Sequence, residues 1–198
     1  MASVSSAPGR RERGKQEKLR RIVEAASELL ADRGIDDVTT QEIAERADIG
    51  AGTLFLYART KGELLLLVQN SAYELALERG IAAAADVDDA LGAILAIVRP
   101  IVACNRTQVD NGRTYLREIV FGDPTEPHHR AALGHTAATE AAIAAVLERH
   151  GHAAVRAAAL AHIVSAIMLV TLASTANAGA SNEALVRDVA GQVEVLLA

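Results

Sequence analysis

The sequence predicts an all-α protein of about nine helices, with a small N-terminal domain followed by a larger C-terminal one. Three observations favour this class. Hydrophobic residues make up 51% of the 198 residues but aromatic residues only 3%, so the core is built mainly from Ala, Leu, Val and Ile. The chain contains four prolines. Its apolar residues recur at helical spacing, without the alternation of Val, Thr and Tyr that marks strands.

Charge and cysteine content bound the possible functions. The net charge of −5 argues against a surface that is basic throughout. Between residues 10 and 21, however, seven basic residues stand against two acidic ones. The single cysteine, Cys104, excludes an intrachain disulfide and fits a reducing cytoplasm. The Ser- and Arg-rich N-terminus has no apolar segment of the kind found in secretory signals.

Residues 1–14 are expected to form a disordered basic arm, because Ser, Pro, Gly and Arg follow one another there without apolar periodicity. Two interpretations of this arm stay open. It is either a solvated tail or a segment that reaches DNA phosphates or the minor groove. The basic side chains available for such contacts are those of Arg10, Arg11, Arg13 and Lys15.

A first helix is expected from Lys15 to Arg33, because Ile22 and Leu29 lie on one apolar stripe. Gly34 then occupies the place of a glycine that ends a helix. This helix would complete a three-helix domain, since two short helices alone are not stable.

Residues 39–64 predict two short helices joined by a tight turn and followed by the start of a longer helix. Thr39 or Thr40 can cap the first, because a hydroxyl there accepts from an unpaired backbone N–H. The turn centres on Asp48, a residue type that tolerates unusual backbone angles. The second helix begins near Ala51. This is the helix-turn-helix arrangement, whose second helix enters the major groove of DNA.

The rest of the chain predicts further helices. They are expected at residues 61–79, from residue 88 to a turn at Asn111 and Gly112 with a kink at Pro100, and at residues 113–121, 127–150, 152–177 and 182–197.

Residues 157–176 form an uncharged run that is long enough to raise the alternative of a membrane span. The run is rich in alanine and lacks an aromatic belt or a flanking basic cluster, which disfavours a membrane. We expect it to pair with the last helix in a homodimer interface. The last helix would contribute the stripe Leu185, Val186, Val189, Val193, Leu196 and Leu197.

At this point the motif can be compared with known families. The spacing of Thr39, Ile43, Ala47, Gly52 and Tyr57, continued by Lys61 and Leu64, resembles the TetR family of bacterial transcriptional regulators. The likeness covers about 50 residues, including the first helix and Gly34, and the remainder matches only in helical layout. Asp48, Gly50 and Ala58 depart from the usual pattern, in which Gly, Ser and Phe are common.

The resemblance implies a DNA-binding domain at residues 15–60 and an effector-binding and dimerisation domain at residues 61–198. It also implies a homodimer on a palindromic double-stranded DNA operator. The hydroxyls of Thr53 and Tyr57 and the ammonium group of Lys61 suit phosphates, which fix position without reading sequence. Small or polar side chains suit approach to base edges. The expected DNA contacts are Thr39, Thr40, Gln41, Gly50, Ala51, Gly52, Thr53, Leu56, Tyr57 and Lys61.

The effector of such a protein would occupy a mainly aliphatic pocket in the C-terminal domain. Several polar residues of the expected C-terminal helices are candidates for the lining of this pocket. For each of them the alternative is an ordinary hydrogen bond between helices or at the surface. They are Asn105, Arg113, Tyr115, Arg117, His128, His135 and His162.

Other classes of function find less support. The six histidines show no tight spacing of metal ligands, and Cys104 fits a buried apolar role better than a redox role. No catalytic triad or paired carboxylate can be placed, so we expect neither an enzyme nor a cofactor or metal. The hypothesis is therefore a cytoplasmic, ligand-responsive, homodimeric repressor. An activator or a ligand-independent DNA-binding regulator of the same fold is the alternative.

Overall fold

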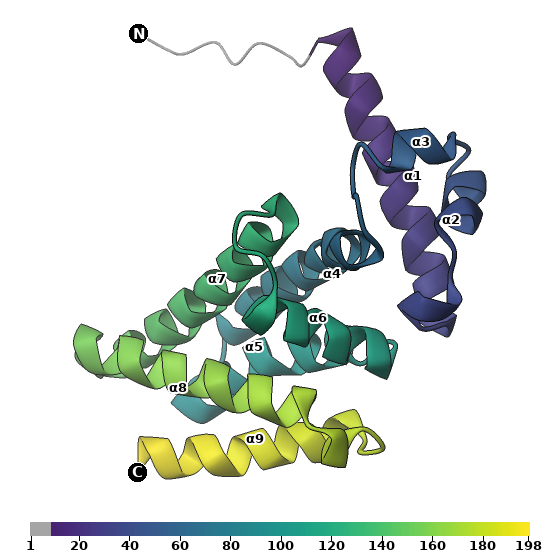
Figure 1. Cartoon of the computed structure of the whole chain (residues 1–198). Helices are drawn as coiled ribbons and strands as arrows, with labels where there is room; N and C mark the ends of the chain where they lie inside the picture. The colour runs from purple at the N-terminus through teal and green to yellow at the C-terminus, as the bar shows by residue number, and fades with distance from the viewer. Residues whose placement is uncertain (1–8) are drawn as a thin grey trace, which may run out of the picture.

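The computed structural model describes residues 9–198, and within them every regular element is helical (Figure 1). The all-α prediction is therefore confirmed. The α-helices are α1 (Arg10–Asp32), α2 (Thr40–Arg46), α3 (Ala51–Leu54), α4 (Lys61–Ala84), α5 (Ala90–Asn105), α6 (Val109–Phe121), α7 (Pro127–Arg149), α8 (Ala154–Ala173) and α9 (Asn182–Leu197). Two short 3₁₀ helices, Ile35–Asp37 and Thr175–Asn177, connect some of them.

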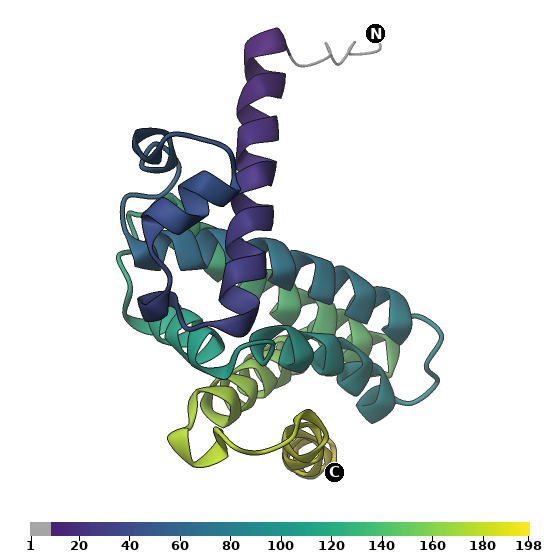
Figure 2. The same ribbon diagram turned by 90° about the vertical axis from the view of Figure 1, so that its right-hand side faces the viewer.

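Two hydrophobic cores organise the molecule, and α4 contributes to both. Its residues Leu64, Leu65 and Val68 are buried with α1, α2 and α3 in the N-terminal core. Tyr73 and Leu77, further along α4, are buried in the C-terminal core with α5 to α9. In both views α1 to α3 lie on one side of α4 and the remaining helices on the other (Figures 1 and 2). A domain boundary at residue 60 would therefore separate the N-terminal core from α4, the helix that completes it.

The first helix begins earlier than expected. α1 starts at Arg10, so residues 10–14 belong to a helix and not to a disordered arm. The reason is composition: Arg, Glu, Lys and Gln are good helix formers, and Glu12 lies in the first turn, where a carboxylate is favoured. Residues 1–8 of the expected arm lie outside the described residues.

The turn of the helix-turn-helix motif has the geometry that its sequence predicts. Thr39 caps α2, and its hydroxyl accepts from the N–H of Glu42, while the Glu42 carboxylate accepts from the N–H of Thr39. At the other end the N–H of Ile49 donates to Ala44, and Asp48 adopts a φ of 52°. This is the helix-ending motif that usually places glycine where Asp48 stands. Asp48 is held there by an ion pair with Arg21 at 3.1 Å.

The second helix of the motif is shorter than the sequence predicts, since it was expected to include residues 53–57. α3 covers only Ala51–Leu54, and residues 55–57 continue as a turn in which the N–H of Tyr57 donates to Leu54. Leu54 is buried, as its place in the pattern predicts, whereas Phe55 is 47% exposed.

Two expectations about glycine are wrong, and the helix that contains Pro100 is not broken there. Gly34 has a φ of −61° and caps the 3₁₀ helix Ile35–Asp37, so it does not end α1 in a left-handed conformation. Gly80 lies inside α4, where an added Cβ would be 2.8 Å from Cα of Ile97, and the glycine is needed for close helix packing. Pro100 lies inside α5, which continues to Asn105 without a break.

The prediction of a turn at Asn111 and Gly112 is also wrong, because both residues lie inside α6. Gln108 caps this helix, and its side chain accepts from the N–H of Asn111 at 2.6 Å. Contacts with α5 and α1 override the preference of an Asn-Gly pair for a turn.

The last two helices are found where expected, but their faces differ from the prediction. Leu185, Val186, Val189 and Val193 of α9 are buried in the C-terminal core and face α5 and α8. They are therefore not available to a second subunit. The outward apolar residues include Ile163 and Val170 of α8 and Val195 of α9, with exposed fractions of 41%, 69% and 77%.

α8 is the one described helix that is long and apolar enough to cross a membrane alone, whereas α5 and α6 would pass only as a pair bent by 111°. Only 39% of the most apolar stretch of α8 is buried within the chain.

Candidate functional site

The exposed surface of α3 is made of small or apolar side chains. Gly50, Gly52 and Leu56 are exposed, and Leu56 has an exposed fraction of 83%. A Cβ added to either glycine would meet no atom of the described chain within 4 Å. Packing therefore does not require glycine at these positions. The space in front of them is open to a molecule outside the chain, as close approach to base edges would need.

The polar residues that flank α3 make contacts within the chain. The hydroxyl of Tyr57 donates to the carbonyl of Lys15 at 3.2 Å, which ties the end of the motif to α1. The ammonium group of Lys61 donates to the carbonyls of Ile35 and Asp36 at 3.2 and 3.1 Å. An ammonium group has three donors, so one remains for a phosphate. Thr53 is half-buried beside them.

The predicted contacts in α2 have mainly structural partners. Thr39 is engaged with Glu42, whose pKa is lowered to about 2 by the backbone N–H and hydroxyl of Thr39 and by Arg33. Gln41 donates to Glu45 at 2.7 Å, and Thr40 is half-buried at the start of the helix. The capping contact holds the N-terminal end of α2.

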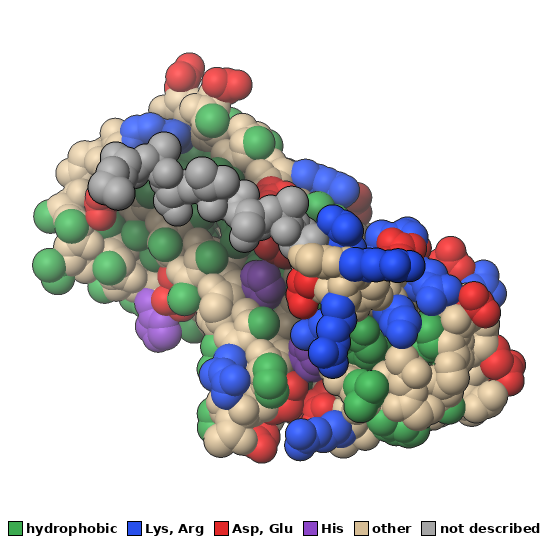
Figure 3. All heavy atoms as spheres, turned by 90° about the horizontal axis from the view of Figure 1, so that it is seen from above, with side chains coloured by type: hydrophobic (Ala, Val, Ile, Leu, Met, Phe, Trp, Pro, Cys, Tyr) green, Lys and Arg blue, Asp and Glu red, His purple; other side chains and the backbone are tan. Residues whose placement is uncertain are grey.

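The basic residues of α1 fall into two groups. Arg10, Arg11 and Lys15 are exposed near its start, as is Arg13, which has a contact of its own within the chain. Arg20 instead forms ion pairs with acidic residues one turn away on the same helix. Seen from above, Lys and Arg side chains gather mainly on the side of the N-terminal helices (Figure 3).

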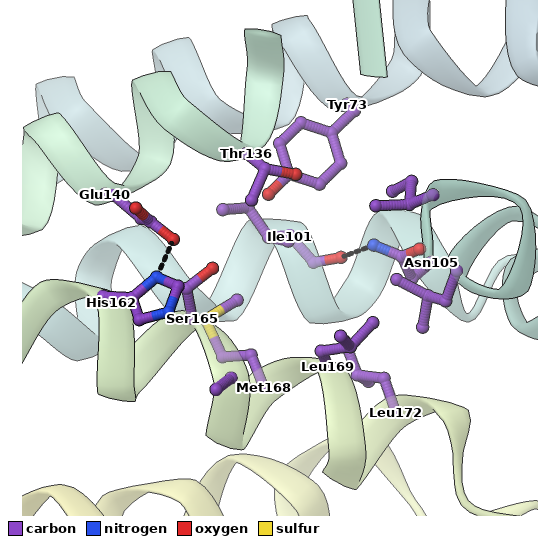
Figure 4. Close-up of a pocket in the computed structure, with 13 residues that line it drawn as sticks. Tyr73, Ile101, Asn105, Thr136, Glu140, His162, Ser165, Met168, Leu169 and Leu172 are labelled. Atoms are coloured by element: carbon purple, nitrogen blue, oxygen red, sulfur yellow. Dashed lines mark hydrogen bonds and ion pairs between the residues drawn. The ribbon is translucent and has the colours of Figure 1, made fainter. Parts of the chain in front are cut away.

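A cavity of about 320 Å³ lies in the C-terminal part, between α4, α5, α6, α7 and α8 (Figure 4). Most of its lining is aliphatic. The polar lining residues are Tyr73, Asn105, Thr136, Glu140, His162 and Ser165. A cavity of this size falls within the range that binds small molecules in proteins.

The structure brings two of the seven candidate residues, Asn105 and His162, to this cavity. Arg113 and Arg117 line a separate surface hollow between α6 and α8. Tyr115 is fully buried behind the cavity. The other two do not line the cavity either: His135 stacks at 5.8 Å from the ring of Tyr73, and His128 lies at the junction with the N-terminal helices.

Sequence reasoning missed four polar lining residues, Tyr73, Thr136, Glu140 and Ser165. Thr136 and Glu140 are four residues apart on α7, a spacing that places them on one face of a helix. This spacing could have identified a polar face on α7. It does not show which other helices that face contacts.

A hydrogen-bond path connects the region behind the cavity to the end of the helix-turn-helix motif. The hydroxyl of Tyr115 donates to Oδ1 of Asn70 at 2.9 Å, and Nδ2 of Asn70 donates to the carbonyl of His128 at 2.8 Å. Nε2 of His128 lies 2.8 Å from the carbonyl of Tyr57, so this nitrogen must carry a proton and donate it. The start of α7 is thereby attached to Tyr57, in the turn that follows α3.

Asn111 of α6 makes a second attachment. Its Oδ1 accepts from the N–H of Ile35 at 2.7 Å, and its Nδ2 donates to the carbonyls of Leu30 and Arg33 at 2.9 and 3.0 Å. The side chain is buried, with 4% exposed. One amide from the C-terminal part thus satisfies three backbone groups at the end of α1.

The remaining reactive groups do not form a site. Burial raises the pKa of Cys104 to about 11, so it is a thiol at neutral pH. Within residues 9–198, no three His, Cys, Asp or Glu side chains come together as a metal-ligand set would require.

Comparison with known proteins agrees with this architecture. Residues 22–68 match the sequence profile described as "Bacterial regulatory proteins, tetR family". Among curated protein sequences, no significant match is found.

Solved structures with the same fold cover most of the chain. A TetR transcriptional regulator from Rhodococcus sp. RHA1 is 15% identical, with a TM-score of 0.72 over 92% of this chain and 96% of its own. A TetR-family regulator from Streptomyces coelicolor is 22% identical, with a TM-score of 0.66 over 92% and 95%. A transcriptional regulator from Cytophaga hutchinsonii is 17% identical, with a TM-score of 0.67 over 91% and 96%.

At these identities the structural likeness establishes the fold, and the sequence profile establishes the helix-turn-helix region. TetR-family regulators are DNA-binding transcription factors and not enzymes. Residues 22–68 therefore match the helix-turn-helix domain of the TetR family, and the chain as a whole has the fold of the solved TetR-family transcriptional regulators.

Proposed function

We propose that the protein is a cytoplasmic homodimeric repressor that leaves a palindromic operator when a small molecule binds its C-terminal cavity. The observation that carries this proposal is the attachment of the cavity's helices to the DNA-binding region. α6 and α7 border the cavity, and each carries a side chain, Asn111 and His128, that is hydrogen-bonded to the N-terminal helices. A ligand that shifts α6 or α7 would therefore shift the supports of α3.

On DNA, α3 would enter the major groove and the two copies of α3 in a dimer would reach successive grooves, ~34–36 Å apart. Gly50, Ala51, Gly52 and Leu56 would approach base edges, with Gln41 beside them. The remaining predicted contacts, Thr39, Thr40, Thr53, Tyr57 and Lys61, would lie along the phosphates, as would Arg10, Arg11, Arg13 and Lys15 of α1.

Lys61→Ala should weaken binding to operator and nonspecific DNA alike, because a phosphate contact carries no sequence information. The slope of log affinity against log salt concentration should fall by about one unit. Fluorescence anisotropy at several salt concentrations measures both effects. Arg156→Ala, which removes one exposed positive charge at the start of α8, is the matched control and should leave the slope unchanged. Equal slopes for Lys61→Ala and the parent would remove Lys61 from the phosphate contacts.

The dimer interface is proposed for the outward face of α8 and α9. Ile163, Val170 and Val195 expose apolar surface there, and Ala166 and Gly191 leave room for close approach of another helix. A second copy of the chain presents the same apolar face, so a two-fold dimer would cover all of it at once. The unburied apolar surface of α8 is then covered by protein and needs no membrane.

Val170→Glu combined with Val195→Glu should convert dimers to monomers, because each change places a carboxylate in the proposed apolar interface. Sedimentation velocity at a concentration where the parent is dimeric measures the change. Leu75→Glu on α4, where Leu75 is 52% exposed, is the control and should stay dimeric. A double variant that remains a dimer would place the interface elsewhere. Val189→Glu would instead unfold the chain, because Val189 is fully buried.

The ligand response is tested after recovery of the genomic DNA that the full-length protein binds. The affinity for that operator is compared with and without molecules that bind the cavity. A fall in affinity supports the proposal, and equal affinity favours the ligand-independent alternative. A reporter gene behind the operator then separates repression from activation by the sign of its response.

A further inference from the structure

We propose that the cavity selects an elongated, mainly aliphatic molecule that carries no negative charge and that donates a hydrogen bond to Oδ1 of Asn105. This inference rests on the proposed function, because it takes the cavity as the effector site, and it adds the chemical class of the effector.

The first argument is an unsatisfied acceptor in the cavity wall. Asn105 is 3% exposed and lines the cavity. Its Nδ2 donates to the carbonyl of Ile101 at 3.1 Å, which fixes the orientation of the amide, because the opposite orientation would bring two oxygens together. Oδ1 is then the free atom, and it is buried without a hydrogen-bond partner among residues 9–198. Buried acceptors are almost always paired, so a donor on the ligand would complete this site.

The second argument is the charge of the lining. No Lys or Arg lines the cavity. Glu140 and His162 stand at the end away from Asn105, and Nδ1 of His162 lies 2.9 Å from the Glu140 carboxylate (Figure 4). An anionic group placed beside them would be repelled by the Glu140 carboxylate, and no Lys or Arg of the lining would offset this repulsion. Neutral or cationic molecules do not carry that penalty.

The third argument is the shape and chemistry of the walls. Between the two polar ends the lining is largely aliphatic, with Ile101, Met168, Leu169 and Leu172 labelled in Figure 4. The lining contains no Phe or Trp, and Tyr73 supplies its one phenol ring. A flexible aliphatic chain fits such walls, whereas a flat aromatic ligand would have little to stack on.

Four probes of matched size test the inference by isothermal titration calorimetry with the full chain at neutral pH. They are 1-octanol, its isomer 1-methoxyheptane, octylammonium and octanoate. The alcohol should bind about tenfold tighter than the isomeric ether, which has no donor. Octanoate should bind at least about tenfold weaker than 1-octanol, and octylammonium no weaker than 1-octanol.

Two variants assign the effects to residues. In Asn105→Leu the alcohol and the ether should bind within about twofold of each other, because the acceptor is gone. In Glu140→Gln, a change at the solvent-facing end that keeps the side-chain shape, the preference for alcohol should persist and the affinity for octanoate should rise. Glu140→Gln keeps the test decisive if Asn105→Leu fails to fold.

The inference is overturned if the ether equals the alcohol in the parent protein, if octanoate binds as tightly as 1-octanol, or if none of the probes binds at millimolar concentration. The same holds if Asn105→Leu folds and keeps the preference for alcohol. Operator affinity measured on the same samples separates the two proposals. Selective probe binding without a change in operator affinity would leave the chemical class standing and count against the ligand response.

Discussion

Gly112→Ala should destabilise the protein by about 3 kcal/mol or more, a fall of roughly 10 °C in Tm for a chain of this size. An added Cβ would overlap the carbonyl oxygen of Asn105, a backbone atom that cannot move aside on its own. α6 would have to move away from α5 at the point where Asn105 lines the cavity. Thermal and urea denaturation at a fixed protein concentration measure the loss, since the stability of the proposed dimer would depend on concentration.

Gly134→Ala is the matched control for this prediction. Gly134 also lies inside a helix, α7, but a Cβ there would meet no atom of the described chain within 4 Å. Alanine should therefore stabilise the protein by up to about 1 kcal/mol through helix propensity alone. Equal effects of the two substitutions would show that α6 is not held against Asn105 as closely as the structure has it.

Asn111→Ala should destabilise the protein by about 2 kcal/mol, because it leaves the N–H of Ile35 and the carbonyls of Leu30 and Arg33 without their buried partner. The end of α1 and the 3₁₀ helix that follows should loosen. Equilibrium urea unfolding gives the magnitude. Hydrogen exchange of the Ile35 amide gives the location, because this proton loses its acceptor.

An exposed amide provides the comparison for Asn111→Ala. Gln41 of α2 donates to Glu45, one turn later in the same helix, so Gln41→Ala should change stability by less than about 0.5 kcal/mol. If Asn111→Ala proves as mild as this control, the buried amide contributes little to holding α6 against α1. Unchanged exchange at Ile35 would lead to the same conclusion.

The helix-turn-helix motif could be predicted from sequence because its signals are local. The capping residue Thr39, the turn residue Asp48 and the buried Leu54 act within a few residues of their partners, and the structure has all three in those roles. Two other residues act locally in the same way: Pro127 begins α7, and Gly151, with a φ of 90°, follows its end. Local chemistry decides such positions whatever the rest of the chain does.

Where distant contacts decide, the sequence misleads. Asn111 and Gly112 form a pair that favours turns, yet α1 and α5 hold them in a helix. Val189 and its neighbours have the apolar pattern of an interface, but α5 already covers them within one chain. The spacing of residues along a helix identifies a face, and only the assembled fold shows what that face contacts.

The cavity was the least predictable feature for the same reason. Its lining comes from five helices, and Asn105 was singled out only as one of several polar residues. Asn105 is distinguished by its side-chain oxygen, which has no hydrogen-bond partner among the described residues. This property depends on the positions of α4, α6 and α8. His128 was also expected to line the cavity. Its side chain instead bonds to the carbonyl of Tyr57, in the turn after α3.

The division of α4 between two cores has a consequence for how the protein folds. Because Leu64, Leu65, Leu67 and Val68 complete the N-terminal core, residues 9–60 hold an incomplete core without α4. α4 in turn is ordered by its burial against α5 and α7. Because α4 is shared in this way, we expect a substitution that loosens the C-terminal core to lower the stability of the N-terminal helices as well.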